Sequence, residues 1–208
     1  MTIRPVHALC RSAAPYRIEV GGVLTAAGVR RGPHLLTVLA SGSWEVRAGT
    51  SDAVRARFPE SLVAPALYDA HVHLHPSVDL ADYVAHGVTR VRDLGSRVGA
   101  GQELPTARDC ADPLPDVVLG GPVLSGPGRP RLPIAAEWDH ADDLPALVDA
   151  AARRGARWLK LYTRFPVELY PVAVDHAHAH GLRVTAHCRP GGYAAAVRAG
   201  VDELQHLA

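Results

Sequence analysis

After about residue 65, short apolar runs alternate with segments of helical periodicity, and this alternation constrains the fold more than any other feature. Strands that alternate with helices form a parallel sheet with helices on its faces, so we expect an α/β fold. Six runs predict strands: Ala66–Val72, Val88–Asp93, Asp116–Gly120, Arg157–Tyr162, Leu182–His187 and Val201–His206. The intervening segments predict helices: Leu80–His86, Ala141–Arg154, Pro166–His180 and Gly191–Ala199, with a weaker one at Gln102–Cys110.

The first 65 residues follow a different pattern. Three short apolar segments predict strands at Tyr16–Val20, His34–Leu39 and Trp44–Arg47. Glycine, proline and serine separate them, as is typical of turns. We therefore expect two parts, a small, partial β-rich unit at residues 1–65 and the α/β part at residues 66–208.

The composition excludes several functions. The net charge is +1 and no basic block is longer than a pair, so neither nucleic acid nor a membrane surface is an expected partner. No apolar run approaches the ~18 residues that a membrane span requires. The three cysteines (Cys10, Cys110 and Cys188) are too few and scattered for a disulfide framework, which favours a cytoplasmic location. A small-molecule substrate is the expected partner.

Polar residues stand where four of the predicted strands end. His71 and His73 alternate after an apolar run, so on a strand they project to the same side. Lys160, His187 and His206 occupy the fourth, fifth and sixth strands near their ends. Each alone is more often a packed or solvated side chain than a ligand. Function collects at the carboxyl ends of parallel strands, however, and imidazoles there predict a metal site.

Lys160 is the unusual member, because an unpaired ammonium is costly to bury. Burial lowers the pKa of a lysine and favours the neutral amine. A neutral amine can react with carbon dioxide to form a carbamate, and that anion can bridge two cations. The alternative is a lysine that extends from the strand end to solvent.

Five segments together resemble the amidohydrolase superfamily of metal-dependent hydrolases, from about residue 17 to the end of the chain. They are Pro65-Ala-Leu-Tyr-Asp69-Ala-His71-Val-His73, Gly87-Val-Thr-Arg-Val-Arg-Asp93-Leu-Gly95, Leu159-Lys160-Leu161, Thr185-Ala-His187 and Gly200-Val-Asp-Glu-Leu-Gln-His206. Ala66 stands where the family usually has glycine. The resemblance implies a distorted (β/α)8 TIM-type barrel with two divalent metal ions, zinc being favoured over manganese, iron or cobalt. It also implies that residues 1–65 are a portion of a small β-sandwich.

Carried over residue by residue, the resemblance implies that His71 and His73 hold one ion and that His187 and His206 hold the other. Carboxylated Lys160 would bridge the two. A metal-activated hydroxide would then cleave an amide, a cyclic amide or a dipeptide-like C–N bond. Tyr162, Arg164 and Arg189 follow the ligand strands closely enough to contact a substrate.

The family pattern also requires an aspartate at the end of an eighth strand, and the sequence ends two residues after His206. Eight units take about 250 residues, so we expect an incomplete barrel of about six βα units, the N-terminal portion of a longer hydrolase. No catalytic residue is assigned, since Asp93 is a poor geometric substitute. Three alternatives stay open: an inactive metal-binding remnant, assembly with a complementing C-terminal segment or as a homo-oligomer, and a mononuclear deaminase of the same superfamily.

Other histidines and a cysteine receive no metal role. His75 directly precedes a proline, after the strand should have ended. His176, His178 and His180 fall on a predicted helix, where a solvated face is favoured over metal binding. Cys188 should point away from His187 and pack in the core. The glycine- and proline-rich segment 120–133 is either a substrate loop or a plain connector.

Overall fold

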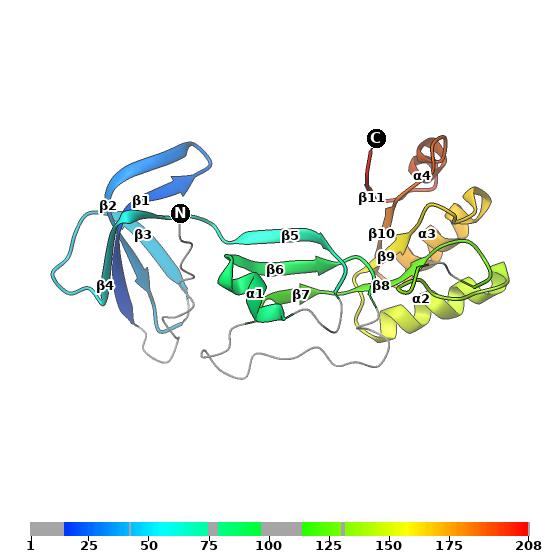
Figure 1. The fold of residues 1–208 in the computed structure, drawn as a ribbon, viewed down its shortest axis with the longest axis horizontal. Coiled ribbons are helices and arrows are strands. Elements are labelled where there is room, and N and C mark those ends of the chain that lie inside the picture. Colours follow the sequence, from blue (N-terminus) through cyan, green and yellow to red (C-terminus); the bar gives the residue numbers. More distant parts are fainter. Residues whose placement is uncertain (1–14, 42, 75–78, 97–113, 130–131, 208) are drawn as a thin grey trace. The chain divides into compact units, whose positions relative to one another are not determined.

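The computed structural model describes residues 15–41, 43–74, 79–96, 114–129 and 132–207, and the chain divides into two compact units (Figure 1). The first contains Met1–Leu67, Ala81–Val88 and Thr106–Leu114, and the second contains Tyr68–Leu80, Thr89–Pro105 and Pro115–Ala208. The helix predicted at 102–110, together with His75, Cys10 and Cys110, lies outside the described residues.

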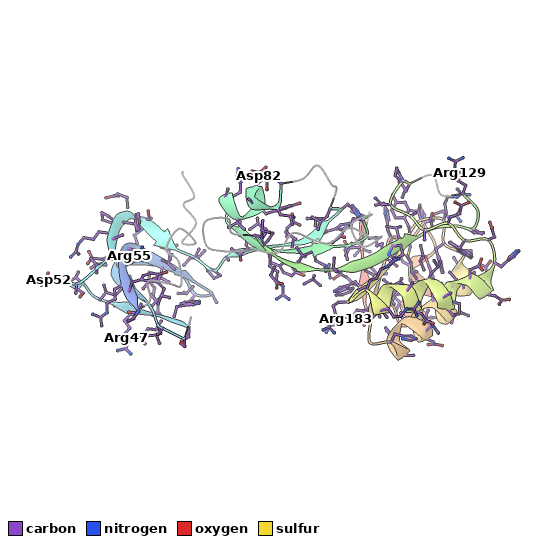
Figure 2. All side chains as sticks on the ribbon, turned by 90° about the horizontal axis from the view of Figure 1, so that it is seen from below. Arg47, Asp52, Arg55, Asp82, Arg129 and Arg183 are labelled. Carbon is purple, nitrogen blue, oxygen red and sulfur yellow. The ribbon has the colours of Figure 1, made fainter. Side chains whose placement is uncertain are left out.

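The N-terminal sheet has four strands in the order β3-β2-β1-β4. They are β1 (Tyr16–Thr25), β2 (Gly28–Val38), β3 (Trp44–Ala48) and β4 (Ala56–Val63). Alternation buries Ile18, Val20 and Leu36 on one face, while charged side chains such as Arg47 and Arg55 are exposed (Figure 2). These strands form one sheet, and a second sandwich layer is not among the described residues.

Two features of this sheet differ from the prediction. Strand β4 was missed because it carries Pro59 and alternates weakly; it is an edge strand, where a missing N–H is tolerated. Strand β1 does not stop at Gly21 and Gly22 but continues through them with a shift of register. A Cβ atom on Gly21 would lie 1.7 Å from the carbonyl oxygen of Pro59, so the glycine serves close strand packing rather than a turn.

The described residues of the second part of the chain form seven short strands. They are β5 (Leu67–Val72), β6 (Val88–Asp93), β7 (Asp116–Val118), β8 (Gly120–Leu124), β9 (Trp158–Leu161), β10 (Arg183–Ala186) and β11 (Glu203–Leu204). One sheet has the order β5-β6-β7 and the other β11-β10-β9-β8. The pairs β6–β7, β8–β9, β9–β10 and β10–β11 are parallel, as the alternation of strands and helices predicts.

All six predicted strands are present in this part, but the third is divided. Strands β7 and β8 are separated by Leu119 alone, and each pairs with a different neighbour. Strand β8 takes up the first residues of the glycine- and proline-rich segment 120–133. Within the described residues no ladder joins β5 to β11, so a closed barrel is not formed there.

The helices follow the predicted positions closely. They are α1 (Leu80–Ala85), α2 (Leu144–Arg153), α3 (Tyr170–Ala179) and α4 (Tyr193–Arg198), with 3-10 turns η3 (Ala141–Asp143) and η4 (Val167–Leu169) leading into α2 and α3. Pro145 and Pro171 stand in the first turns of α2 and α3, where a missing N–H costs nothing. No helix in the described ranges is long and apolar enough to cross a membrane.

The main hydrophobic core lies where α2 and α3 pack on β8, β9 and β10 (Figure 1). It includes Val148 of α2 and Val174 of α3, both almost fully buried, and Leu159 and Val184 of the strands. This packing holds the strands and both helices as one framework. Side chains at the strand ends and on the outer helix faces therefore occupy defined positions.

Candidate metal centre

Four histidines predicted at strand ends lie in a continuous row. His71 is in β5, His73 follows it, His187 follows β10, and His206 lies two residues beyond β11. The ring centroids are 5.3 Å apart for His73 and His71, 5.0 Å for His71 and His206, and 4.5 Å for His206 and His187. The structure thus brings together side chains that are separated by up to 135 positions in the sequence.

The hydrogen bonds of His71 and His73 define which ring nitrogen is available. The Nδ1 atom of His71 lies 2.7 Å from Oε1 of Gln205, and Nδ1 of His73 lies 2.7 Å from the carbonyl oxygen of Gly95. Since both partners are acceptors, Nδ1 donates and Nε2 keeps a free lone pair. Gly95 has a φ of 115°, which favours glycine and lets its carbonyl face the ring. This is the arrangement that orients metal-binding histidines in proteins.

His206 adopts a strained backbone conformation. Its φ of 54° is the single positive value for a non-glycine residue in the described part of the chain. A left-handed residue of this kind costs about 1–3 kcal/mol and persists where the surroundings enforce it. The hydroxyl of Tyr193 donates to the carbonyl oxygen of His206 at 2.9 Å and helps to hold this turn. The strain therefore accompanies the placement of the imidazole beside His187.

Lys160 lies in β9 and is buried, with only 2% of its surface exposed. Its Nζ atom has no hydrogen-bond partner among the residues that the structure describes, and neither does Nδ1 of His187. Burial lowers the pKa of Lys160 to about 8, although the nearby Glu203 carboxylate opposes the change. Burial also lowers the pKa of His71 and of His187. Burial therefore shifts these nitrogen atoms towards their neutral forms, which have free lone pairs.

An ion pair joins the buried Arg92 to the half-buried Glu203. Both terminal nitrogens of Arg92 donate to Glu203, at 2.9 and 2.7 Å, and its Nε donates to the carbonyl oxygen of Ala70 at 2.6 Å. Gln205 in turn donates to Glu203, which leaves its amide oxygen directed at His71. The guanidinium also stacks over Trp158, 4.3 Å from the ring centroid. This network links β5, β6 and β11 and orients one histidine.

Sequence reasoning missed this network. A signal was present, because Arg92 and Glu203 each place a charged side chain within a short predicted strand. Such charges are rarely buried without a partner. The sequence pattern contained no indication that these two residues pair with each other.

The remaining predicted residues are placed as follows. The buried carboxylate of Asp93 accepts bonds from Ser96 and, at 3.4 Å, from the backbone N–H of Leu74, and burial raises its pKa. Tyr162 meets His187 edge-on, with 5.0 Å between centroids, while Arg164 and Arg189 are exposed. Cys188 is buried in the core, where its sulfur accepts a bond from the Tyr170 hydroxyl. Asp93 thus connects two strand ends, and Cys188 packs as its position predicts.

The segment 120–133 folds back on the chain rather than extending freely. The backbone of Val123 accepts a bond from Ala136, Gly128 donates to Trp138 at 2.6 Å, and the Trp138 indole donates to the carbonyl oxygen of Ser125. A role in substrate binding stays a prediction for this loop.

The strand-end cluster, defined as His71, His73, Lys160, His187 and His206, fits the metal pair that the family resemblance implies. Two imidazoles have oriented, free Nε2 atoms, and a buried amine lacks a partner. Nitrogen donors of this kind suit zinc and neighbouring transition metals. The described residues also hold a second His/Asp group that could bind a metal ion, Asp149, His176 and His180, on helices α2 and α3.

The amino-acid sequence is similar to those of a few known proteins. No family model matches the chain. Uncharacterized proteins from Mycobacterium tuberculosis and Mycobacterium bovis are 32% identical in an alignment that covers 72% of this chain. The alignment covers 45% of each relative, so the chain spans about half the length of the curated relatives that it matches.

Several solved structures are similar in fold to this chain. A. niger ochratoxinase has a TM-score of 0.65 at 17% identity, in an alignment that covers 92% of this chain and 60% of the ochratoxinase chain. The N-acetyl-D-glucosamine-6-phosphate deacetylase from Mycobacterium smegmatis has a TM-score of 0.58 at 18% identity, with the same coverage. Bottromycin amidohydrolase has a TM-score of 0.56 at 24% identity, in an alignment that covers 83% of this chain and 38% of the bottromycin amidohydrolase chain. The chain thus has the fold of a portion of each of these proteins, one of which is named an amidohydrolase.

Proposed function

We propose that this chain carries the metal-binding strands of an amidohydrolase-type hydrolase. In this proposal His71 and His73 hold one divalent ion, and His187 and His206 hold the second. Carboxylated Lys160 bridges the two ions. Zinc is the expected metal, because imidazole-rich sites in proteins favour it.

The observation that carries the proposal is the buried, unpartnered Nζ atom of Lys160 beside a row of imidazoles. A buried ammonium there would repel any cation held by the histidines. The neutral amine instead attacks the carbon of carbon dioxide: a C–N bond forms, one C=O π bond opens to give a carboxylate, and the amine proton leaves to solvent. The lysine then contributes a negative charge, which offsets two divalent cations better than any other group in the cluster.

The proposed reaction is hydrolysis of an amide, a cyclic amide or a dipeptide-like C–N bond. When bound, the two ions would polarise the substrate carbonyl and lower the pKa of a water molecule. Within this chain, Gln205 and Gly95 fix the rings of His71 and His73, and Tyr162 limits the space beside His187. The exposed Arg164 and Arg189 are suited to bind a substrate carboxylate. Neighbours named as a deacetylase and an amidohydrolase support this class of reaction.

Metal analysis tests the proposal directly. The variant His176→Gln/His180→Gln, purified with Zn²⁺ and bicarbonate, is expected to hold two ions by inductively coupled plasma mass spectrometry. It lacks the two α3 histidines that could hold zinc elsewhere, so the count refers to the strand-end cluster. Carbon-13 bicarbonate should give a carbamate resonance in the wild type and none in Lys160→Met. A chain in which Lys160 stays unmodified and no zinc is retained would contradict the proposal.

The same measurements separate the alternatives. One ion in the cluster, retained in Lys160→Ala, would indicate the mononuclear deaminase instead. Two ions without hydrolysis of a panel of amides, cyclic amides and dipeptides would indicate a metal-binding chain that is inactive as it stands. Hydrolysis lost in Lys160→Met together with one or both ions supports the binuclear hydrolase.

A further inference from the structure

We propose that Asp149, His176 and His180, here named the helix-face cluster, form a second metal site that binds one Zn²⁺ ion on the outer face of α2 and α3. This site is distinct from the strand-end cluster. It does not depend on the proposed hydrolase function.

The three side chains converge on one point. His176 and His180 are one helical turn apart on α3, so their rings lie on the same face, with 4.9 Å between centroids. The Nε2 atoms of both rings reach the same oxygen, Oδ1 of Asp149 on α2, at 2.8 and 2.9 Å. All three potential ligand atoms lie within 4.8 Å of one another.

A zinc ion fits between these atoms with small movements. Tetrahedral zinc has ligands at about 2.0–2.1 Å, which places its ligand atoms about 3.3 Å apart. The observed nitrogen–oxygen distances of 2.8 and 2.9 Å therefore need to widen by roughly half an ångström. A change of this size is within the range that we expect side-chain rotation to supply.

The framework under the cluster is rigid, and its surface is open. Ala173 and Ala177, on the same helix, are fully buried, as is Val148 next to Asp149. The ligand side chains themselves are 31–40% exposed, so an ion can enter and water can complete its coordination. Arg153, whose charge also acts on Asp149, opposes a cation. We therefore expect moderate rather than very tight binding.

His178, on the same helix, has fewer potential metal ligands around it than His176 and His180 have. It contacts only Asp202, at 2.9 Å, and that carboxylate oxygen also accepts the backbone N–H of Val184 at 2.7 Å. One histidine and one occupied carboxylate give two ligands at most. His178 therefore serves as a matched control with the same residue type, helix and kind of partner.

The test is isothermal titration of Zn²⁺, near pH 7.5, into the metal-free wild type and variants. The wild type and His178→Gln should bind one ion per chain more than the double variant His176→Gln/His180→Gln. This difference is expected whether or not the strand-end cluster also binds zinc. Asp149→Asn should bind about tenfold more weakly, a difference of about 1.4 kcal/mol.

A second readout is thermal stability, because an ion that joins α2 to α3 stabilises the folded state. Zinc should raise the melting temperature of the wild type and of His178→Gln by more than it raises that of the double variant. Equal stoichiometry and affinity in wild type and double variant would overturn the proposal. If the double variant does not fold, Asp149→Asn decides, and unchanged zinc affinity in that variant overturns it equally.

Discussion

The histidines at the strand ends and those on helix α3 have different partners. On α3, His176, His178 and His180 each contact an aspartate. At the strand ends, His71 and His73 bond to neutral oxygens, and the nearby Lys160 has no partner within the described residues. The first arrangement gives each ring nitrogen a carboxylate oxygen as its partner. The second leaves lone pairs unused and is suited to a metal ion.

Burial strengthens this difference. It lowers the pKa of Lys160 and of His71, so protons are disfavoured at the strand ends. On the helix face the hydrogen bond from His176 lowers the pKa of Asp149, so the charged carboxylate is favoured there. The comparison teaches that histidines can be oriented in two ways, by neutral oxygen acceptors beside a buried lysine at the strand ends and by a shared carboxylate on the helix face. The variants below test this distinction.

The largest expected effect comes from Glu203→Ala. The Arg92 side chain is only 8% exposed, and without Glu203 its buried charge has no carboxylate partner. We therefore expect a loss of about 3 kcal/mol in the free energy of unfolding. Urea denaturation measures this loss. The control is Glu45→Ala, which breaks an exposed pair with Arg47 and should cost under about 1 kcal/mol. Equal losses in the two variants would mean that the strand-end region is no more charge-sensitive than the surface.

Lys160→Met should stabilise the metal-free chain at pH 7 while it disrupts the metal bridge. The pKa of Lys160 falls from 10.5 to about 8 in the folded state, which corresponds to a penalty of about 3 kcal/mol wherever the amine is protonated in both states. The penalty is complete below pH 8 and disappears as the pH rises to 10.5. The advantage of the variant should therefore shrink between these values in urea titrations. A variant that is less stable than the wild type at pH 7 would show that Lys160 has a stabilising partner.

Gln205→Leu should weaken metal binding without removing a ligand. His71 loses the acceptor that orients its ring, and changes of this kind typically cost 10- to 100-fold in metal affinity. Competition with a zinc chelator measures the affinity. Gln205→Glu, which keeps an acceptor, should retain most of it. If leucine and glutamate behave alike, orientation by residue 205 is unimportant.

The smallest effect is expected for Asp149→Asn in the absence of metal. The lowered pKa of Asp149 means that its charged form stabilises the fold above the ordinary value of 3.8, and that this contribution is lost as the pH falls through the lower folded-state pKa. A slight destabilisation near pH 6 should therefore vanish near pH 2. Asp175→Asn is the matched control, because Asp175 is an exposed aspartate on α3. An equal destabilisation in this control would show that the histidine partners of Asp149 do not contribute to stability.

Much of the fold could be predicted because its signals are local. Alternation on β5 places His71 and His73 on one side, and an apolar run with a lysine near its end identified β9. The prediction was less successful where tertiary contacts decide the outcome. Strand β4 has an unfavourable proline that only an edge position tolerates, and β7 is separated from β8 because its neighbours change at Leu119.

By itself, the sequence determined the order of strands and helices and the presence of ligand-type residues at the strand ends. Both follow from periodicity and from residue type over a few positions. Only the tertiary structure decided that Gln205 orients His71 across 134 positions, that Glu203 pairs with Arg92 across 111, and that Asp149 meets His176 across 27. These contacts depend on how the strands and helices pack, and no local pattern encodes which distant polar groups the packing brings into hydrogen-bonding distance.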